Sequence, residues 1–286
     1  MTQEAFQKQR QKSILAVMDI SGVGRCSALA VVPVLSLSGC SCAFLPTAYF
    51  STHTGGFGAV HRLDMKADME QAIAHYKRLG LRFDAVYIGY AASEDHLRVL
   101  EEALSDLLLP DGKLYLDPVM GDHGRRYAFC GEGLIEGYRR LCKKADVIFP
   151  NQTEAALLLG NPISESTEPA VPDAHSLRGL GAGKVVLTGV SSPEGEIGVL
   201  AVPLTGEAFS VFRPKHPGSF PGTGDLFAAC VIASLMKGAR FTTACEIACD
   251  FLDISLRATA AFDSEPRFGL AFEKALPGLC AALGQL

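Results

Sequence analysis

The chain alternates short apolar runs with longer segments in which apolar residues recur every three or four positions. The short runs predict buried strands, and the longer segments predict amphipathic helices. Strands are predicted at residues 14–18, 42–50, 85–88, 113–116, 147–149 and 184–188, followed by an antiparallel hairpin over 197–203 and 208–213. Helices are predicted at residues 27–38, 65–79, 95–108, 223–236, 241–261 and 268–283.

This alternation predicts an α/β fold with a mostly parallel central sheet and helices on both faces. We expect residues 13–286 to form a single domain, preceded by a polar extension over residues 1–12. In sheets of this kind, ligands bind at the carboxyl ends of the strands. The loops that follow the predicted strands are therefore where functional residues are expected.

Composition and charge exclude some classes of function. Hydrophobic residues make up 48% of the chain and charged residues 20%, as in an ordinary globular protein. The net charge of −5 argues against a nucleic-acid partner, because binding to a phosphate backbone needs a basic surface. A polyphosphate ligand would therefore have to be held locally, by backbone amides, a few basic side chains and a divalent metal.

The location of the protein is predicted from its termini and its cysteines. No apolar stretch approaches the ~20 residues of a membrane span, and residues 1–12 are too polar for a signal peptide. The nine cysteines contain no Cys-x-x-Cys pair, which favours reduced and mostly buried thiols over a zinc or redox site. We therefore expect a cytoplasmic protein with no membrane partner.

The segment Gly222-Thr223-Gly224-Asp225 opens a long apolar helix and carries the clearest chemistry. Glycine lets backbone amides approach a phosphate closely, and a helix N-terminus adds partial positive charge. Such an anion hole can stabilise a phosphoryl group during transfer, and Asp225 beside it suits a general base for an attacking alcohol. Alternatively, Asp225 only stabilises the first turn of its helix. The sequence has no Walker-type phosphate loop.

Together with the Phe-Ala-Ala sequence that soon follows, this segment closely resembles the signature of ribokinase-like sugar and vitamin kinases. The resemblance extends over roughly residues 14–261 and implies a ribokinase-like three-layer sandwich. It also implies that Asp225 is the catalytic base and that the amides of Gly222, Thr223 and Gly224 form the anion hole.

Further segments that follow predicted strands resemble the nucleotide and metal site of the same family. The similarity of residues 150–154 to a Pro-Asn-x-x-Glu motif implies that Asn151 lies near the phosphates and that Glu154 organises Mg²⁺. Asp117 begins an Asp-Pro-Val-x-Gly-Asp segment, which implies a role near the metal and the nucleotide, and Thr188 is expected to contact a nucleotide phosphate. The local alternatives are a capping box at Asn151 and Glu154 and a type I turn at Asp117.

The acceptor pocket is predicted from residues 50–57, which resemble a Ser-Asn-His-Thr-Gly-Tyr stretch of pyridoxal kinases. In those enzymes the threonine contacts the polar edge of the pyridine ring, which implies the same role for Thr54. A substituted pyridine needs short hydrogen-bonding groups and an apolar wall. We expect the former also from Asp19 and Ser21, and the latter from Tyr90 and Val23.

The resemblance therefore implies a pyridoxal kinase, which transfers the γ-phosphate of ATP to the 5′-hydroxymethyl group of pyridoxal, pyridoxine or pyridoxamine. It implies ATP as co-substrate, Mg²⁺ as cofactor and a homodimer as the assembly. A monovalent cation is a further cofactor of many pyridoxal kinases, but Phe149 stands where many of them have threonine.

Two other functions compete with this interpretation. The sequence Asp19-Ile20-Ser21-Gly22 is similar to the start of hydroxymethylpyrimidine kinases, so the chain could be such a kinase or accept both rings. The other alternative is a catalytically silent vitamin-binding protein with the same fold. The presence of Asp225 and Glu154 argues against it, because such a protein needs neither a base nor a residue that organises a metal.

Overall fold

Most of the strands belong to one sheet in the computed structural model, which describes residues 10–163, 171–262 and 265–286. The sheet consists of β1 (Ser13–Ser21), β2 (Ser41–Phe50), β3 (Arg62–Asp64), β4 (Phe83–Ile88), β5 (Leu108–Leu116), β8 (Val147–Ile148), β9 (Lys184–Ser191), β10 (Glu196–Val202) and β11 (Phe209–Pro214). Their order is β11-β10-β9-β8-β5-β4-β1-β2-β3. The strands from β2 to β9 in this order run parallel, whereas β3, β10 and β11 pair antiparallel to their neighbours.

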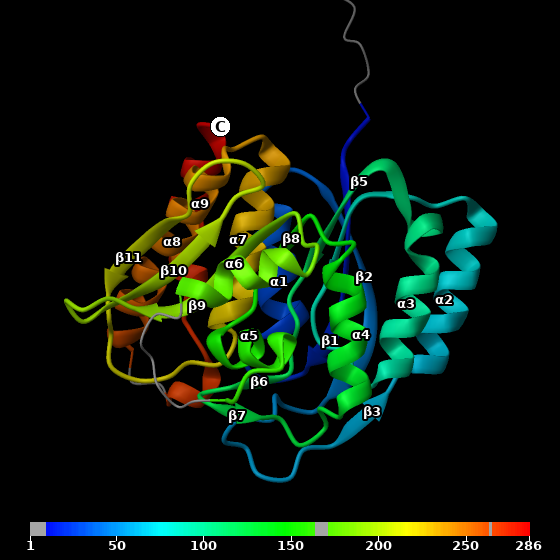
Figure 1. Ribbon diagram of the computed structural model, residues 1–286, viewed down its shortest axis with the longest axis horizontal. Helices are drawn as coiled ribbons and strands as arrows, with labels where there is room; N and C mark the ends of the chain where they lie inside the picture. Colours follow the sequence, from blue (N-terminus) through cyan, green and yellow to red (C-terminus); the bar gives the residue numbers. More distant parts are fainter. Residues whose placement is uncertain (1–9, 164–170, 263–264) are drawn as a thin grey trace, which may run out of the picture.

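Helices cover both faces of this sheet (Figure 1). One face carries α1 (Ser27–Ser36), α7 (Thr223–Lys237), α8 (Phe241–Ala260) and α9 (Leu276–Gly284). The other carries α2 (Lys66–Leu79), α3 (Glu94–Leu107), α4 (Glu132–Cys142), α5 (Gln152–Leu159) and α6 (Val171–Gly179). The predicted three-layer α/β architecture is confirmed.

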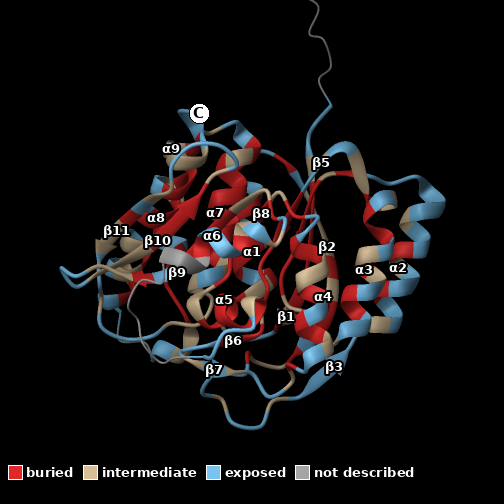
Figure 2. Ribbon diagram, viewed as in Figure 1, coloured by how far each residue is buried: buried red, intermediate tan, exposed pale blue. Residues whose placement is uncertain are grey.

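The central strands are apolar on both faces because each face is covered by helices. In β1, Ile14 and Ala16 belong to the hydrophobic core under α1 and α7, while Leu15 and Val17 belong to the core under α2 and α3. All four side chains are fully buried. Figure 2 shows the same pattern, with buried strands inside and exposed residues on the outer sides of the helices.

The parallel register brings the carboxyl ends of β1, β4, β5 and β8 to one edge of the sheet. A small hairpin of β6 (Gly121–Asp122) and β7 (Arg125–Arg126) lies at this edge, together with the loop that joins β2 to β3 (Figure 1, bottom). Every segment that the sequence marks as functional thus follows a strand at this edge or begins a helix beside it.

Three sequence-based expectations need correction or fall outside the structure. Helices α4 and α6 were not predicted. A single helix over residues 268–283 is wrong: this stretch contains the 3₁₀ turns η1 (Pro266–Phe268) and η2 (Phe272–Lys274) and then α9. Gly269, at φ +78°, interrupts it, and Pro277 is tolerated because it stands in the first turn of α9. Most of the polar extension over residues 1–12 lies outside the described residues.

Two glycines should respond to alanine in opposite directions. In β10, a Cβ on Gly198 would lie 1.9 Å from the carbonyl oxygen of Val211, whereas a Cβ on Gly278 in α9 would have nothing within 4 Å. We expect Gly198→Ala to lower the free energy of unfolding by about 1–3 kcal/mol through overpacking. Gly278→Ala should raise it by about 0.5 kcal/mol, because alanine favours a helix more than glycine does. Chemical denaturation of both variants measures the difference, and shifts of the same sign would contradict the packing described for β10.

Candidate active site

The turn before α7 is packed against the turn that follows β1. Gly222, the residue before α7, has φ +81°, a left-handed conformation that favours glycine. A Cβ at this position would lie 2.0 Å from the carbonyl oxygen of Arg25 and 2.8 Å from the Cα of Cys26. The first turn of α7 therefore begins in direct contact with the residues that open α1.

Asp225 lies in the first turn of α7, and the amide of Ser27, at the start of α1, donates a hydrogen bond of 2.8 Å to its Oδ2. Burial raises the pKa of the Asp225 carboxyl to about 7; the hydrogen bond from Ser27 lowers it, and the negative charge of Asp19 raises it. A carboxylate with a pKa near neutrality can both accept and release a proton at physiological pH, as a general base must.

The other residues of this turn present backbone groups. The Thr223 hydroxyl donates a 2.7 Å hydrogen bond to the carbonyl oxygen of Phe220, which fixes the loop before the helix. Gly224 is exposed. The first amides of any α-helix have no partner within the helix, so those at the start of α7 can bind an anion there.

Asp117 follows β5 at the same edge and is 8% exposed. Burial raises the pKa of its carboxyl to about 8; the charge of Asp225 raises it further, and a 3.4 Å hydrogen bond from the Tyr87 hydroxyl lowers it. Burial and the charge of Asp117 also hold the pKa of Glu154 well above its usual range. Asp117 is therefore close enough to repel both Asp225 and Glu154 when these groups are ionised.

Asn151 and Glu154 form the capping box that was the local alternative at the sequence level. The Asn151 Oδ1 accepts from the Glu154 amide at 2.9 Å, and Glu154 Oε2 accepts from the Asn151 amide at 2.9 Å. The second oxygen of Glu154 accepts from the Met120 amide at 3.1 Å. Asn151 also donates to the Gly121 carbonyl at 2.8 Å, so both side chains join the start of α5 to the segment after β5.

Thr188, in β9, lies next to Asn151 through an isolated bridge between the two backbones. Its amide donates to the carbonyl oxygen of Pro150 at 2.9 Å, and its hydroxyl reaches the same oxygen at 3.4 Å. Thr188 therefore belongs to the same edge of the sheet, beside the capping box.

The donor set at this edge consists of carboxylate and amide oxygens, the ligands that Mg²⁺ prefers. Among the described residues, no three His, Cys, Asp or Glu side chains are arranged to hold a metal ion by themselves. Asp117 and Glu154 are the residues whose mutual repulsion such a cation would relieve.

Asp19 and Ser21 end β1 on the other side of Asp225. The Ser21 hydroxyl donates to Asp19 Oδ2 at 3.2 Å, and both residues are buried. Burial raises the pKa of Asp19. The rings of Phe50 and Tyr90 meet edge to face at 5.6 Å, and Phe129 continues this wall at 5.1 Å from Tyr90. The result is a pair of polar groups beside an aromatic surface.

Val23 and Thr54 are exposed, and the loop that carries Thr54 is fastened by His53. The Gly55 amide donates to His53 Nδ1 at 3.0 Å, so Nε2 carries the proton and donates to the carbonyl oxygen of Arg267. The His53 amide also donates to the Val23 carbonyl at 3.2 Å. His53 therefore has a structural role that holds Thr54 and Val23 on neighbouring loops.

Several residues that the sequence analysis did not select also line this region. Cys26 and Ser27 start α1, and they follow the Gly-rich turn after β1 directly, which is a signal that could have pointed to them. Tyr127 and Phe129 lie on the segment after the β6–β7 hairpin and stack at 5.7 Å. The sequence indicates Tyr127 and Phe129 less clearly, because aromatic residues occur in polar stretches for many reasons.

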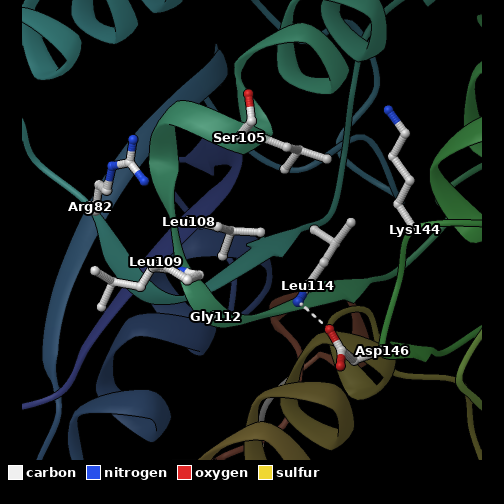
Figure 3. A pocket seen from close by; sticks show the side chains of 10 residues that line it. Arg82, Ser105, Leu108, Leu109, Gly112, Leu114, Lys144 and Asp146 are labelled. Atoms are coloured by element: carbon white, nitrogen blue, oxygen red, sulfur yellow. Dashed lines mark hydrogen bonds between the residues drawn. The ribbon is translucent and has the colours of Figure 1, made fainter.

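A separate surface pocket of about 360 Å³ lies near the amino end of β5, at the edge of the sheet opposite the carboxylates. Its apolar floor is formed by leucines such as Leu108 and Leu114, and the basic side chains of Arg82 and Lys144 stand at its rim (Figure 3). Asp146 accepts a hydrogen bond of 2.9 Å from the Leu114 amide there. None of the predicted site residues lines this pocket.

Comparison with known proteins identifies the family and similar folds. Residues 30–267 match the phosphomethylpyrimidine kinase family. A candidate phosphomethylpyrimidine kinase from Bacteroides thetaiotaomicron, in a crystal form with pyridoxal, is 34% identical with a TM-score of 0.89 and covers 94% of this chain and 96% of its own. The pyridoxal kinase of Lactobacillus plantarum is 31% identical with a TM-score of 0.88, covering 95% and 98%.

The bifunctional thiamine biosynthetic enzyme TH1 of Arabidopsis thaliana is 31% identical over 258 residues, which is 89% of this chain. The chain spans about half the length of that relative and less than two thirds of the next curated relative.

The burial of Asp117, together with the charge of Asp225, predicts an unusual effect of pH on stability. The raised pKa of Asp117 means that the folded protein binds its proton more tightly than the unfolded chain, so stability should fall as pH rises from about 4 to about 8. Asp117→Asn should therefore raise the free energy of unfolding of the ligand-free protein at pH 8.5, by about 2–5 kcal/mol. The gain should shrink towards pH 5.

Asp106→Asn is the matched control. The Asp106 side chain is 45% exposed, and a hydrogen bond from Lys77 lowers the pKa of its carboxyl, so this variant should not gain stability as pH rises. Urea denaturation between pH 5 and 8.5 measures both variants. Parallel curves for the wild type and Asp117→Asn would show that Asp117 is not held in a repulsive site.

Proposed function

This chain belongs to the phosphomethylpyrimidine kinase family within the ribokinase-like superfamily, and we propose that it phosphorylates the 5′-hydroxymethyl group of a B6 vitamer with ATP. The observation that carries the proposal is the position of Asp225. Its carboxylate lies in the first turn of α7, beside free helix amides, and its pKa is raised to about 7. This combination supports a base next to an anion-binding turn.

In the proposed reaction, Asp225 accepts the proton of the substrate alcohol. The alcohol oxygen forms a bond to the γ-phosphorus as the bond between that phosphorus and the ADP oxygen breaks. The amides of Gly222, Thr223 and Gly224 face the charge on the transferred group. Positioning and electrostatic stabilisation account for most of the catalysis in phosphoryl transfer, so little covalent chemistry is asked of the protein.

The acceptor ring is proposed to lie against Tyr90 and Phe50, with Asp19, Ser21 and Thr54 at its polar substituents. The edge-to-face pair of Phe50 and Tyr90 supports this, because it presents an aromatic surface next to the buried Asp19. The presence of pyridoxal in a crystal form of the Bacteroides thetaiotaomicron relative supports the same ligand class. Val23, on the neighbouring loop, is proposed as a further apolar contact.

The nucleotide is proposed to lie along Asp117, Asn151 and Thr188, which share one edge of the sheet. Mg²⁺ bound near Asp117 and Glu154 would neutralise phosphate charge. Within the described ranges, Glu154 accepts hydrogen bonds from two backbone amides, whereas the Asp117 side chain accepts only the long one from Tyr87, so Asp117 has more lone pairs available to a ligand. A monovalent cation is not supported by Phe149, which offers no side-chain oxygen.

A second candidate function is a hydroxymethylpyrimidine kinase, either alone or as a dual activity. The family match and Asp19 favour it, because an aminopyrimidine carries an amino group that a carboxylate can accept from. Pyridoxal-type rings instead present a phenolic oxygen and an aldehyde, alcohol or amine beside it. The two acceptors differ at the polar edge of the ring and share the alcohol.

A homodimer and a cytoplasmic location stay predictions from the sequence. None of the helices within the described ranges is long and apolar enough to cross a membrane. Sedimentation of the purified protein across a range of concentrations would test the dimer.

Asp225→Asn should lower kcat by at least 1,000-fold and leave the affinity for ATP within about threefold, since an amide keeps the shape of the side chain and cannot accept the proton. Single-turnover assays and nucleotide titration measure the two quantities. Asp68→Asn is the matched control, because Asp68 is also an acidic residue in a first helical turn, that of α2, and is exposed. If the two variants have equal kcat, Asp225 is not the base.

A comparison of four alcohols should rank the substrates. We expect pyridoxal, pyridoxine and pyridoxamine to give larger kcat/KM values than hydroxymethylpyrimidine, because the relatives that align over nearly the whole of both chains include a pyridoxal kinase. ADP release with MgATP measures each rate. Preference for the pyrimidine would transfer the function to the second candidate, and turnover of none of the four would favour a silent binding protein.

A further inference from the structure

Ser27 has a backbone conformation that is uncommon for its residue type. Its φ is +49°, and apart from His123 it is the only residue other than glycine in the described ranges with positive φ. Such a conformation is sparsely populated for residues with a Cβ and persists only where the surroundings enforce it. Here the surroundings are the turn before α7, since the backbone of Arg25 and Cys26 presses against Gly222.

This conformation aims the amide of Ser27 away from its own helix and at Asp225. The amide donates at 2.8 Å to Asp225 Oδ2, so one carboxylate oxygen is fixed by the start of α1. Within the described part of the chain, no protein donor contacts the other oxygen of Asp225. The contact therefore orients the carboxylate and leaves one oxygen for a proton from a ligand.

The side chain of Ser27 lies near a different carboxylate, that of Asp19. Its hydroxyl is close enough to Asp19, at the end of β1, to lower the pKa of that carboxyl, while the 3.2 Å hydrogen bond to Asp19 comes from the Ser21 hydroxyl. Asp19 is 5% exposed and lies on the aromatic side of the site. Ser27 thus has its side chain near a group from the acceptor side and donates its main-chain amide to a group from the phosphate-transfer turn.

We propose that Ser27 is a positioning residue whose amide orients Asp225 and whose hydroxyl holds Asp19, so that the acceptor pocket and the phosphate-transfer turn keep a fixed geometry. The inference rests on the proposed function for its kinetic consequences and on the contacts alone for its structural ones. The proposal has two arms: the amide that orients Asp225 and the hydroxyl that holds Asp19. They can be tested separately, because the position of the amide depends on the backbone conformation and the presence of the hydroxyl does not.

The amide arm is tested first without turnover, by NMR on the ligand-free protein. The amide proton of Ser27 should shift as the Asp225 carboxyl titrates, and this shift should disappear in Asp225→Asn. A Ser27 amide that does not respond to pH between 5 and 9 would overturn this arm. Asp19, Asp117 and the Cys26 thiol also face Asp225, so the titration is repeated in Asp19→Asn, where the response of the Ser27 amide should persist.

The kinetic test uses three substitutions. Ser27→Thr keeps the hydroxyl but places a β-branched residue at positive φ, which should displace the amide and lower kcat at least 10-fold with an unchanged KM for ATP. Ser27→Gly and Ser27→Ala keep the amide and lose the hydroxyl. They should raise the KM for the alcohol threefold to 10-fold and leave kcat within about threefold.

Ser36→Thr is the control for the threonine variant, because it makes the same chemical change at an exposed position of the same helix. Ser27→Asn should keep kcat close to the wild-type value, unlike Ser27→Thr, because asparagine tolerates positive φ. Wild-type kcat in folded Ser27→Thr, or an unchanged KM for the alcohol in both Ser27→Gly and Ser27→Ala, would overturn the corresponding arm. Absence of turnover in the wild type would contradict the proposed function and leave the NMR result to decide the contact.

Discussion

The burial of carboxyl groups, with repulsion between some of them, is the constraint on which the site depends. Asp19, Asp117, Glu154 and Asp225 come from four elements, and burial raises the pKa of each of them. A protein can keep such a group in place only if other interactions hold the backbone rigid. Here the sheet and the helices that position them are packed into two hydrophobic layers, so the framework does not depend on the charges. Cations can then neutralise individual carboxylates, and amide donors can form hydrogen bonds with them.

The four carboxyl groups differ in how far the protein already satisfies them. Glu154 accepts two backbone amides, Asp225 accepts one, and Asp19 accepts the Ser21 hydroxyl. Among the described residues, the only donor to the Asp117 side chain is the Tyr87 phenol, at 3.4 Å. A carboxylate that is buried and poorly hydrogen-bonded gains most from an added positive charge. This order makes Asp117 the group most in need of a cation and makes Asp225, which is held on one side only, the group best suited to proton transfer.

The fold was largely predictable from the sequence, because the signals are local. They are the apolar pattern that repeats every 2 residues in strands or every 3.6 in helices, and the glycines that end helices. The helix α4 has the same pattern, and its omission was avoidable, whereas the break at Gly269 depends on a backbone conformation that composition does not reveal. The residues that follow strands were predictable as candidates, since parallel strands share a carboxyl edge. The contact between Ser27 and Asp225 was not, because it joins residues 198 positions apart through the packing of two helices.

A residue that caps a helix needs different contacts from a residue that takes part in catalysis. The contacts of Asn151, Glu154 and Asp225 therefore bear on whether the site is active. Asn151 and Glu154 form a complete capping box, so a protein without activity would have a structural reason to keep them. Asp225 does not cap its own helix: the residue before α7 is Gly222, and the recorded hydrogen bond of Asp225 comes from a different helix. A half-buried carboxylate with a raised pKa is costly to ionise in the ligand-free protein. Its presence is therefore better explained by a function that needs a base than by the requirements of the fold.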